Sequence, residues 1–175
     1  MSVQVSFRVV GLYCYFENLQ LQGVDPTSTV QQVMDAIAQQ QPAFAYKSFD
    51  SSGKQIVNEL SYQFGDNSQQ PYNTLSRPSN GPRDLSISFG PTSLIWQYYR
   101  SVTGTINGSV CEIKLITQGQ PSFADTALNT YDPRFMSIPE GFVIQTYNLT
   151  WRLVQIQMAP ETQAKFMKAM AESMV

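Results

Sequence analysis

The fold class of this 175-residue chain depends on one stretch, Asp25-Pro-Thr-Ser-Thr-Val-Gln-Gln-Val-Met-Asp-Ala-Ile37. Four apolar residues within it recur at the i, i+3, i+4, i+7 spacing of one helix face: Val30, Val33, Met34 and Ile37. We expect Ser28 to cap this helix and Gln31 to complete a capping box, because such a pair satisfies N–H groups left free at a helix start. Pro42 is expected to end the helix, since proline cannot donate the next hydrogen bond.

A β-hairpin is predicted just before this helix. Apolar and polar residues alternate from Val3 to Val9, which is the period-2 pattern of a half-buried strand. A second run from Tyr13 to Val24 alternates leucine with glutamine, and Gly11 between the two runs supplies a turn residue. A hairpin that leads into one amphipathic helix predicts an α+β domain.

Further strands are predicted over 44–49, 85–89, 94–102, 110–116 and 147–158. Asp50 to Gly53 and Asn107-Gly108 are the expected turns, the second a strong hairpin signal. The segment 56–64 reads equally as a short strand or as irregular chain. In the last strand the apolar parity changes after Leu153, which indicates either a β-bulge near 153–154 or a strand that passes between two packing surfaces.

Two long connections are expected at 66–83 and 118–140, because both are rich in turn-forming residues. The first is the only plausible internal boundary, so we expect a single elaborated domain over residues 1–175. Pro160 and Glu161 are predicted to open a C-terminal helix. Its apolar stripe is Phe166, Met167, Met170 and Met174.

Residues 19–37 resemble the second strand and helix start of ubiquitin-like β-grasp domains, in which an acidic-Pro-(Ser/Thr) turn also leads into the helix. Trp96-Gln-Tyr-Tyr99, the Asn107-Gly108 turn and Ile138-Pro-Glu-Gly-Phe-Val-Ile144 are similar to the β-grasp branch that resembles the C-terminal portion of transcobalamin. The resemblance implies a mixed sheet packed on one main helix, with extra strands and a C-terminal helix. The second branch also implies a corrinoid as one possible ligand class.

The chain departs from two activities of β-grasp relatives. Conjugated modifiers and sulfur carriers end in Gly-Gly, whereas this chain ends in Ala-Glu-Ser-Met-Val175, so we do not expect conjugation or sulfur transfer without processing. Plant-type ferredoxins need four cysteine ligands, and this chain has two cysteines. We expect Cys14 and Cys111 to be buried, inert thiols, because neither has a basic neighbour in the sequence.

Composition narrows the function further. The chain has no histidine, which removes Ser-His and Cys-His nucleophile pairs and most zinc and haem sites. Its thirteen acidic residues are spread through turns and helix surfaces, so they indicate no catalytic pair. We therefore expect no enzyme, no metal site and no cofactor.

Charge and hydropathy restrict the partners. The net charge is −2 and the eleven Lys and Arg residues are scattered, which argues against nucleic acid as the main partner. No apolar run approaches the roughly 18 residues of a membrane span. The N-terminus also lacks the pattern of a signal peptide. We therefore expect a cytoplasmic protein without a membrane segment.

Aromatic residues on two predicted strands are the candidate binding residues. They are Trp96, Tyr98, Tyr99, Tyr147 and Trp151. Core packing is the alternative for each of them. Because side chains alternate along a strand, Trp96, Tyr98 and Tyr99 cannot all face one side, so at least one must leave the main core. Phe166 and Met170 join the candidates, since thioether-rich helices suit adaptable partner surfaces.

These observations predict a non-catalytic protein–protein interaction module that uses an aromatic sheet face, a long loop or a strand edge. The first alternative is a small hydrophobic or corrinoid ligand held between the sheet and the connection at 118–140. The second is a structural subunit that associates with itself or with a larger assembly. The residues alone leave all three open.

Overall fold

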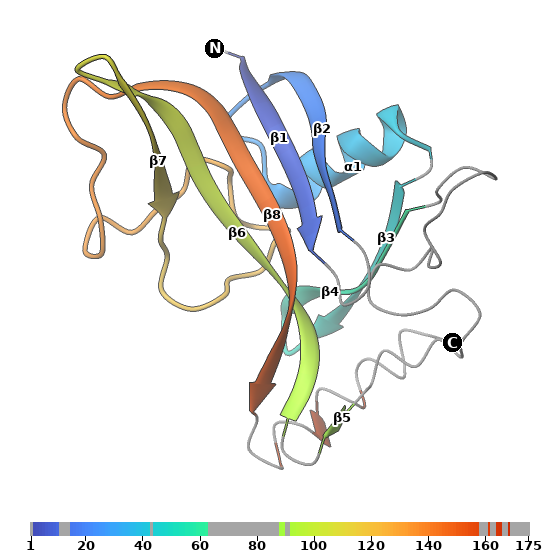
Figure 1. Ribbon diagram of the computed structural model, residues 1–175. Helices are drawn as coiled ribbons and strands as arrows, with labels where there is room; N and C mark the ends of the chain where they lie inside the picture. The colour runs from blue at the N-terminus through green and yellow to red at the C-terminus, as the bar shows by residue number, and fades with distance from the viewer. Residues whose placement is uncertain are drawn as a thin grey trace.

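The computed structural model describes residues 2–10, 15–42, 44–62, 88–89 and 92–157, with residues 161, 164, 165 and 168. In this part of the chain, one helix and two sheets form a mixed α+β fold (Figure 1). The larger sheet has six strands in the order β2-β1-β8-β6-β5, and β7 also pairs with β6. Its strands are β1 (Val3–Val10), β2 (Tyr15–Val24), β5 (Ser88–Phe89), β6 (Thr92–Ile106), β7 (Ser109–Leu115) and β8 (Val143–Gln157).

Strand β1 lies between two different kinds of neighbour. It pairs antiparallel with β2, the next strand in sequence, and parallel with β8, the last strand. Strand β6 pairs antiparallel with β8 and turns into β7 at Asn107 and Gly108, whose φ angles of 51° and 80° suit a two-residue hairpin turn. The two hairpins expected from the sequence, before the helix and at 107–108, are confirmed.

Helix α1 (Val30–Gln40) follows the first hairpin as predicted, but its cap is one residue later than expected. The Thr29 hydroxyl accepts from the Gln32 N–H at 3.1 Å, and the Gln32 side chain accepts from the Thr29 N–H at 2.9 Å. Ser28 belongs instead to the preceding turn, where its N–H donates to the Asp25 carbonyl at 2.9 Å. The expected capping pair of Ser28 and Gln31 is therefore wrong, because this turn delays the helix start.

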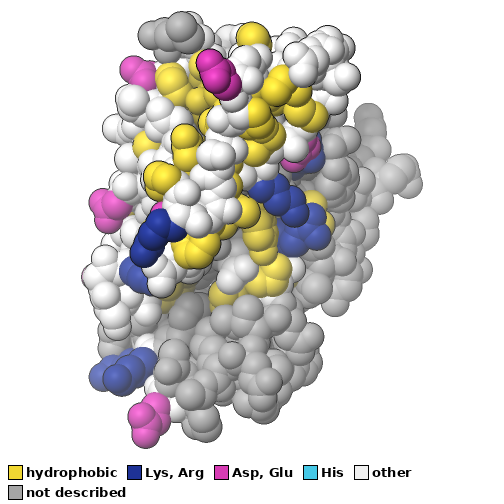
Figure 2. All heavy atoms as spheres, turned by 90° about the vertical axis from the view of Figure 1, so that its left-hand side faces the viewer, with side chains coloured by type: hydrophobic (Ala, Val, Ile, Leu, Met, Phe, Trp, Pro, Cys, Tyr) yellow, Lys and Arg dark blue, Asp and Glu magenta, His cyan; other side chains and the backbone are white. Residues whose placement is uncertain are grey.

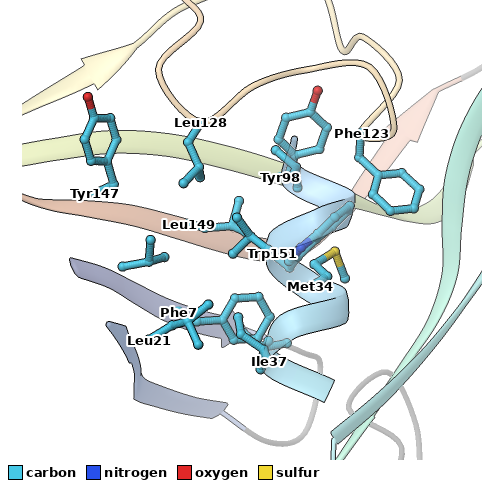
Figure 3. Close-up of a cluster of buried hydrophobic side chains, with 14 of the residues drawn as sticks. Phe7, Leu21, Met34, Ile37, Tyr98, Phe123, Leu128, Tyr147, Leu149 and Trp151 are labelled. Carbon is cyan, nitrogen blue, oxygen red and sulfur yellow. The ribbon is translucent and has the colours of Figure 1, made fainter. Parts of the chain in front are cut away.

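One face of the sheet carries the core. The four stripe residues of α1 are buried, and they pack with alternate side chains of β1, β6 and β8 (Figure 3). The connection at 118–140 has no strand or helix, and it covers the same face with the buried side chains of Phe123 and Leu128. The core is therefore closed partly by irregular chain.

Arg100 fastens that connection to the sheet. Its side chain, only 4% exposed, points from β6 into the core face. Its guanidinium donates to the carbonyl oxygens of Ala127 at 3.0 Å, Leu128 at 3.3 Å and Thr130. Burial lowers the pKa of this guanidinium.

Strands β3 (Phe44–Ser51) and β4 (Lys54–Tyr62) form a separate two-stranded sheet. The segment at 56–64, ambiguous in the sequence, is thus a strand up to Tyr62. The chain reverses at Ser52 and Gly53, where φ is 54° and 84°, and the Asp50 carboxylate accepts from the Gly53 N–H at 2.9 Å. The turn predicted at 50–53 is confirmed.

The parity change in β8 does not come from a bulge at 153–154. Pairing with β6 continues without a shift through Leu153 and Val154, and the irregularity lies at Thr103/Gly104 instead. Pairing of β1 with β8 ends at Arg152, so β8 runs on beside β6 beyond the end of β1 (Figure 1). This arrangement fits the other alternative, a strand that passes between two packing surfaces, because β8 leaves the surface it shares with β1 at that point.

Some expectations lie outside the described residues. They are Cys14, the boundary at 66–83, most of the strand at 85–89, and the stripe Phe166, Met167, Met170 and Met174. Among the described residues, no helix has the length and apolar character needed to cross a membrane.

Candidate functional site

The aromatic residues of β6 divide between the two faces of the sheet. Trp96 and Tyr98 are buried on the core face, with exposed fractions of 3% and 6%. Tyr99 lies on the opposite face and is 46% exposed. The structure therefore separates the Trp-x-Tyr-Tyr stretch as strand alternation requires.

Strand β8 supplies the two remaining aromatic candidates that the structure describes. Trp151 lies directly opposite Tyr98 and is buried against it. Tyr147 lies opposite Val102, further along the same face. Burial raises the pKa of its phenol. The structure thus brings Trp96, Tyr98 and Trp151 together, while Tyr147 and Tyr99 lie apart from them.

A pocket of about 200 Å³ lies where β4 and the segment 120–123 approach β6. Its lining combines these aromatic residues with aliphatic ones from β4 and β6. The apolar lining residues are Ile56, Val57, Ile95, Trp96, Tyr98, Pro121, Phe123 and Trp151. Lys54 is the single charged residue among the described ones that line it. The site is therefore an apolar cavity with one cation in its wall.

Two indole N–H groups in this lining have no acceptor among the residues that the structure describes. The Nε1 atoms of Trp96 and Trp151 are buried, and no described residue accepts a hydrogen bond from either. A buried donor without a partner costs about 1–3 kcal/mol, and buried indoles usually find one. Both tryptophans line the cavity, and their unpaired Nε1 atoms are buried in its wall.

The hydroxyl of Tyr98 is satisfied, in contrast. It donates to the Pro121 carbonyl at 2.7 Å and lies 3.1 Å from the Thr126 hydroxyl. Burial raises the pKa of this phenol, so it stays protonated as a donor. The bond to Pro121 holds the segment 120–123 against β6.

Strand β4 is fixed to the same segment. The Gln55 N–H donates to the Ser122 hydroxyl at 3.1 Å, and the Ser122 carbonyl accepts from the Thr126 hydroxyl at 2.8 Å. Lys54 Nζ donates to the Gln120 carbonyl at 3.5 Å from an exposed position. Hydrogen bonds therefore hold both walls of the cavity in place without a ligand.

Sequence reasoning missed the part of the site that comes from β4 and Phe123. Phe123 packs edge-on against Trp151, with ring centroids 5.9 Å apart (Figure 3). The signal for this contact was an aromatic residue near the start of the connection at 118–140. Ile56 and Val57 gave no comparable signal, because their segment could not be assigned.

The described residues contain no cluster of three or more His, Cys, Asp or Glu side chains placed to hold a metal ion. Cys111, on β7, is a free and partly exposed thiol, so the expectation that it is fully buried is wrong. The chain matches no model of a known protein family and no curated protein.

Proposed function

We propose that this chain is a non-catalytic binding protein, and that its pocket holds a small, mainly apolar molecule with a hydrogen-bond acceptor. The acceptor, a carbonyl or carboxylate oxygen, receives a hydrogen bond from Trp96 or Trp151. The apolar part of the ligand contacts the ring of Phe123 and the aliphatic side chains of β4. The proposal rests on the apolar lining of the cavity, which includes two tryptophans whose indole donors have no acceptor among the described residues.

The volume of the pocket limits its ligand. A cavity of about 150 Å³ accommodates benzene, whereas sites for drug-sized molecules begin near 300 Å³. At about 200 Å³, the pocket suits a molecule built on one ring or a short branched chain. It is too small to enclose a corrinoid, so this volume favours the small hydrophobic ligand of the two alternatives.

The β-grasp assignment belongs to the same proposal. The order of elements supports this assignment: an antiparallel β1–β2 hairpin comes first, α1 follows, and the last strand, β8, pairs parallel with β1. In this assignment, β3 and β4 are an elaboration that supplies one wall of the pocket. The position of the ligand between that elaboration and the sheet would then be specific to this chain.

A matched pair of ligands tests the proposal. Acetophenone and ethylbenzene have nearly the same shape, but only the ketone carries an acceptor. We expect the ketone to bind about tenfold more tightly in calorimetric titrations, because one hydrogen bond to a buried donor contributes about 1–1.5 kcal/mol. Equal binding of both compounds would overturn the hydrogen-bond acceptor part of the proposal and leave an apolar binding cavity. Binding of neither compound would overturn the whole proposal.

Two variants connect this preference to the indole groups. Trp96→Phe and Trp151→Phe keep an aromatic ring and remove one N–H each. We expect at least one of them to abolish the preference for the ketone, while ethylbenzene still binds. Tyr147→Phe, on the core face but outside the lining, is the control and should keep the preference.

A protein partner is the second candidate, and exposed valines favour it. Val110 on β7 and Val143 on β8 both lie opposite Thr105, on the face that carries Tyr99, with exposed fractions of 69% and 61%. Such paired apolar side chains at a sheet end suit a protein contact. Native mass spectrometry of wild type and Val143→Ser tests this, since only wild type should retain a co-purifying polypeptide or a second copy.

A further inference from the structure

A second cavity, of about 620 Å³, lies mainly on the face of the sheet opposite the core, and Arg100, Leu115 and residues from the segment 116–120 also line it. Its lining spans four neighbouring strands. Arg8 on β1 lies opposite Thr150 on β8, and Thr150 lies opposite Tyr99 on β6. Directly paired residues share a face, so these three side chains form one row across the sheet.

Basic side chains flank this row on both sides. Arg152 lies two residues beyond Thr150 on β8, and thus on the same face as Arg8. Lys114 on β7 lies opposite Ser101, on the other side of Tyr99. Figure 2 shows Lys and Arg side chains on both sides of a hydrophobic patch on the β7 side of the molecule.

These cations lack carboxylate partners in the described part of the chain. No described ion pair involves Arg8, Lys114 or Arg152. The Nε–H of Arg8 is buried and no described residue accepts a hydrogen bond from it. The single carboxylate in the lining, Glu112, already accepts from the Ser101 hydroxyl at 2.9 Å. The cavity therefore concentrates positive charge in a chain whose net charge is −2.

We propose that this cavity binds a small phosphate monoester that carries a planar group. A phosphate monoester has a charge near −2 at neutral pH, which complements four cations beside one carboxylate, the fourth being Arg100, and its oxygens suit guanidinium donors. The exposed ring of Tyr99 provides a surface for the planar group, and the neighbouring Ile116 is 44% exposed. This site is separate from the apolar pocket and does not depend on the function proposed there.

Phenyl phosphate is the probe, with benzoate as a ligand of the same ring but a single charge. We expect phenyl phosphate to bind in calorimetric titrations and to bind more weakly as salt is added, because screening weakens exposed charge interactions. Benzoate should bind at least tenfold more weakly. Equal binding of benzoate would overturn the phosphate assignment, and failure of phenyl phosphate to bind would overturn the site.

Charge-removing variants locate the binding. Arg152→Gln and Lys114→Gln change exposed side chains, so both should fold, and each should weaken phenyl phosphate binding about tenfold. Lys47→Gln removes an exposed charge from β3, outside the cavity, and should bind like wild type. Trp96→Phe should also bind like wild type. A loss of binding in Trp96→Phe would contradict the assignment. A loss in the control Lys47→Gln as large as those in Arg152→Gln and Lys114→Gln would also contradict it.

Discussion

The rings of Tyr98 and Trp151 meet edge to face across β6 and β8, with centroids 5.3 Å apart. Both residues are buried, yet within the described part of the chain only the tyrosine has a partner for its polar group. Tyr98 holds the wall of the pocket, and Trp151 lies in the same lining with its indole donor unpaired among the described residues. This division of roles leads to the first prediction.

Removing the polar group of either residue should lower the stability of the fold, but for a different reason in each case. Tyr98→Phe deletes one oxygen and leaves the Pro121 carbonyl without this donor, so we expect a loss of about 1–2 kcal/mol in the free energy of unfolding. Trp151→Phe deletes more atoms but breaks no hydrogen bond to any described residue. Its loss should be confined to packing, about 1–2 kcal/mol.

Urea unfolding of both variants measures these values. A loss near zero for Tyr98→Phe would contradict the structural role of its hydroxyl. A loss well above the packing value for Trp151→Phe would show that its indole N–H already has a partner, and would remove the basis of the proposed ligand site.

Replacing Arg100 should loosen the connection that closes the core. Arg100→Met keeps much of the aliphatic volume but removes the donors to three carbonyl groups. We expect a loss of about 2–3 kcal/mol in stability, because hydrogen bonds to a charged group are stronger than neutral ones. Hydrogen exchange should show faster exchange at the amides of 123–130. The exposed Arg134→Met is the control, and unchanged exchange in Arg100→Met would be inconsistent with this role.

Gly104 should tolerate no side chain. A Cβ atom there would lie 2.1 Å from the Val143 carbonyl oxygen and 2.8 Å from the Phe142 ring. Since backbone is one of the obstacles, Gly104→Ala must shift β8 at its irregular pairing, and we expect a loss of about 1–3 kcal/mol. Thermal unfolding checks this against Ser109→Ala on the neighbouring strand. Equal melting temperatures for the two variants would disprove the close approach.

Acid should destabilise the turn before α1. The Asp25 carboxylate accepts from the N–H of Thr27 at 2.8 Å and from its hydroxyl at 2.7 Å, and these bonds lower the pKa of Asp25. Because the folded pKa lies below the unfolded value of about 3.9, ionised Asp25 stabilises the fold above that pH, and the contribution is lost as pH falls through the folded pKa.

Asp25→Asn keeps an acceptor but cannot titrate. Melting temperatures measured from neutral pH down through the acid range should therefore fall less steeply in this variant than in wild type. A parallel fall in both proteins would assign the acid sensitivity to other groups, such as Asp132, whose pKa the hydrogen bonds from Arg134 also lower.

The sequence predicted the elements whose pattern is local. The stripe of α1 and the Asn107-Gly108 turn depend on residues a few positions apart, so their periodicity and turn chemistry identified them. The predicted cap of α1 was wrong by one residue. Ser28 and Thr29 are both good cap residues, and the turn that begins at Asp25 places Thr29 at the helix start.

The site was less predictable because it depends on distant segments. The two tryptophans and Tyr98 were found as aromatic strand residues, but the choice between core and binding surface needed the position of β4. That hairpin approaches β6 from outside the main sheet, and no period in the sequence encodes such a contact. Arg8 and Arg152 likewise become neighbours only through the parallel pairing of the first and last strands.

The chain has two tryptophans, so a ¹H–¹⁵N spectrum contains only two indole resonances, one from Trp96 and one from Trp151. Titration with acetophenone up to its solubility limit should move at least one of them downfield and slow its exchange with water, while ethylbenzene should produce neither change. That result is expected if the ligand supplies the acceptor that the pocket lacks. Indole resonances that respond alike to both compounds, or to neither, would contradict the proposed ligand site.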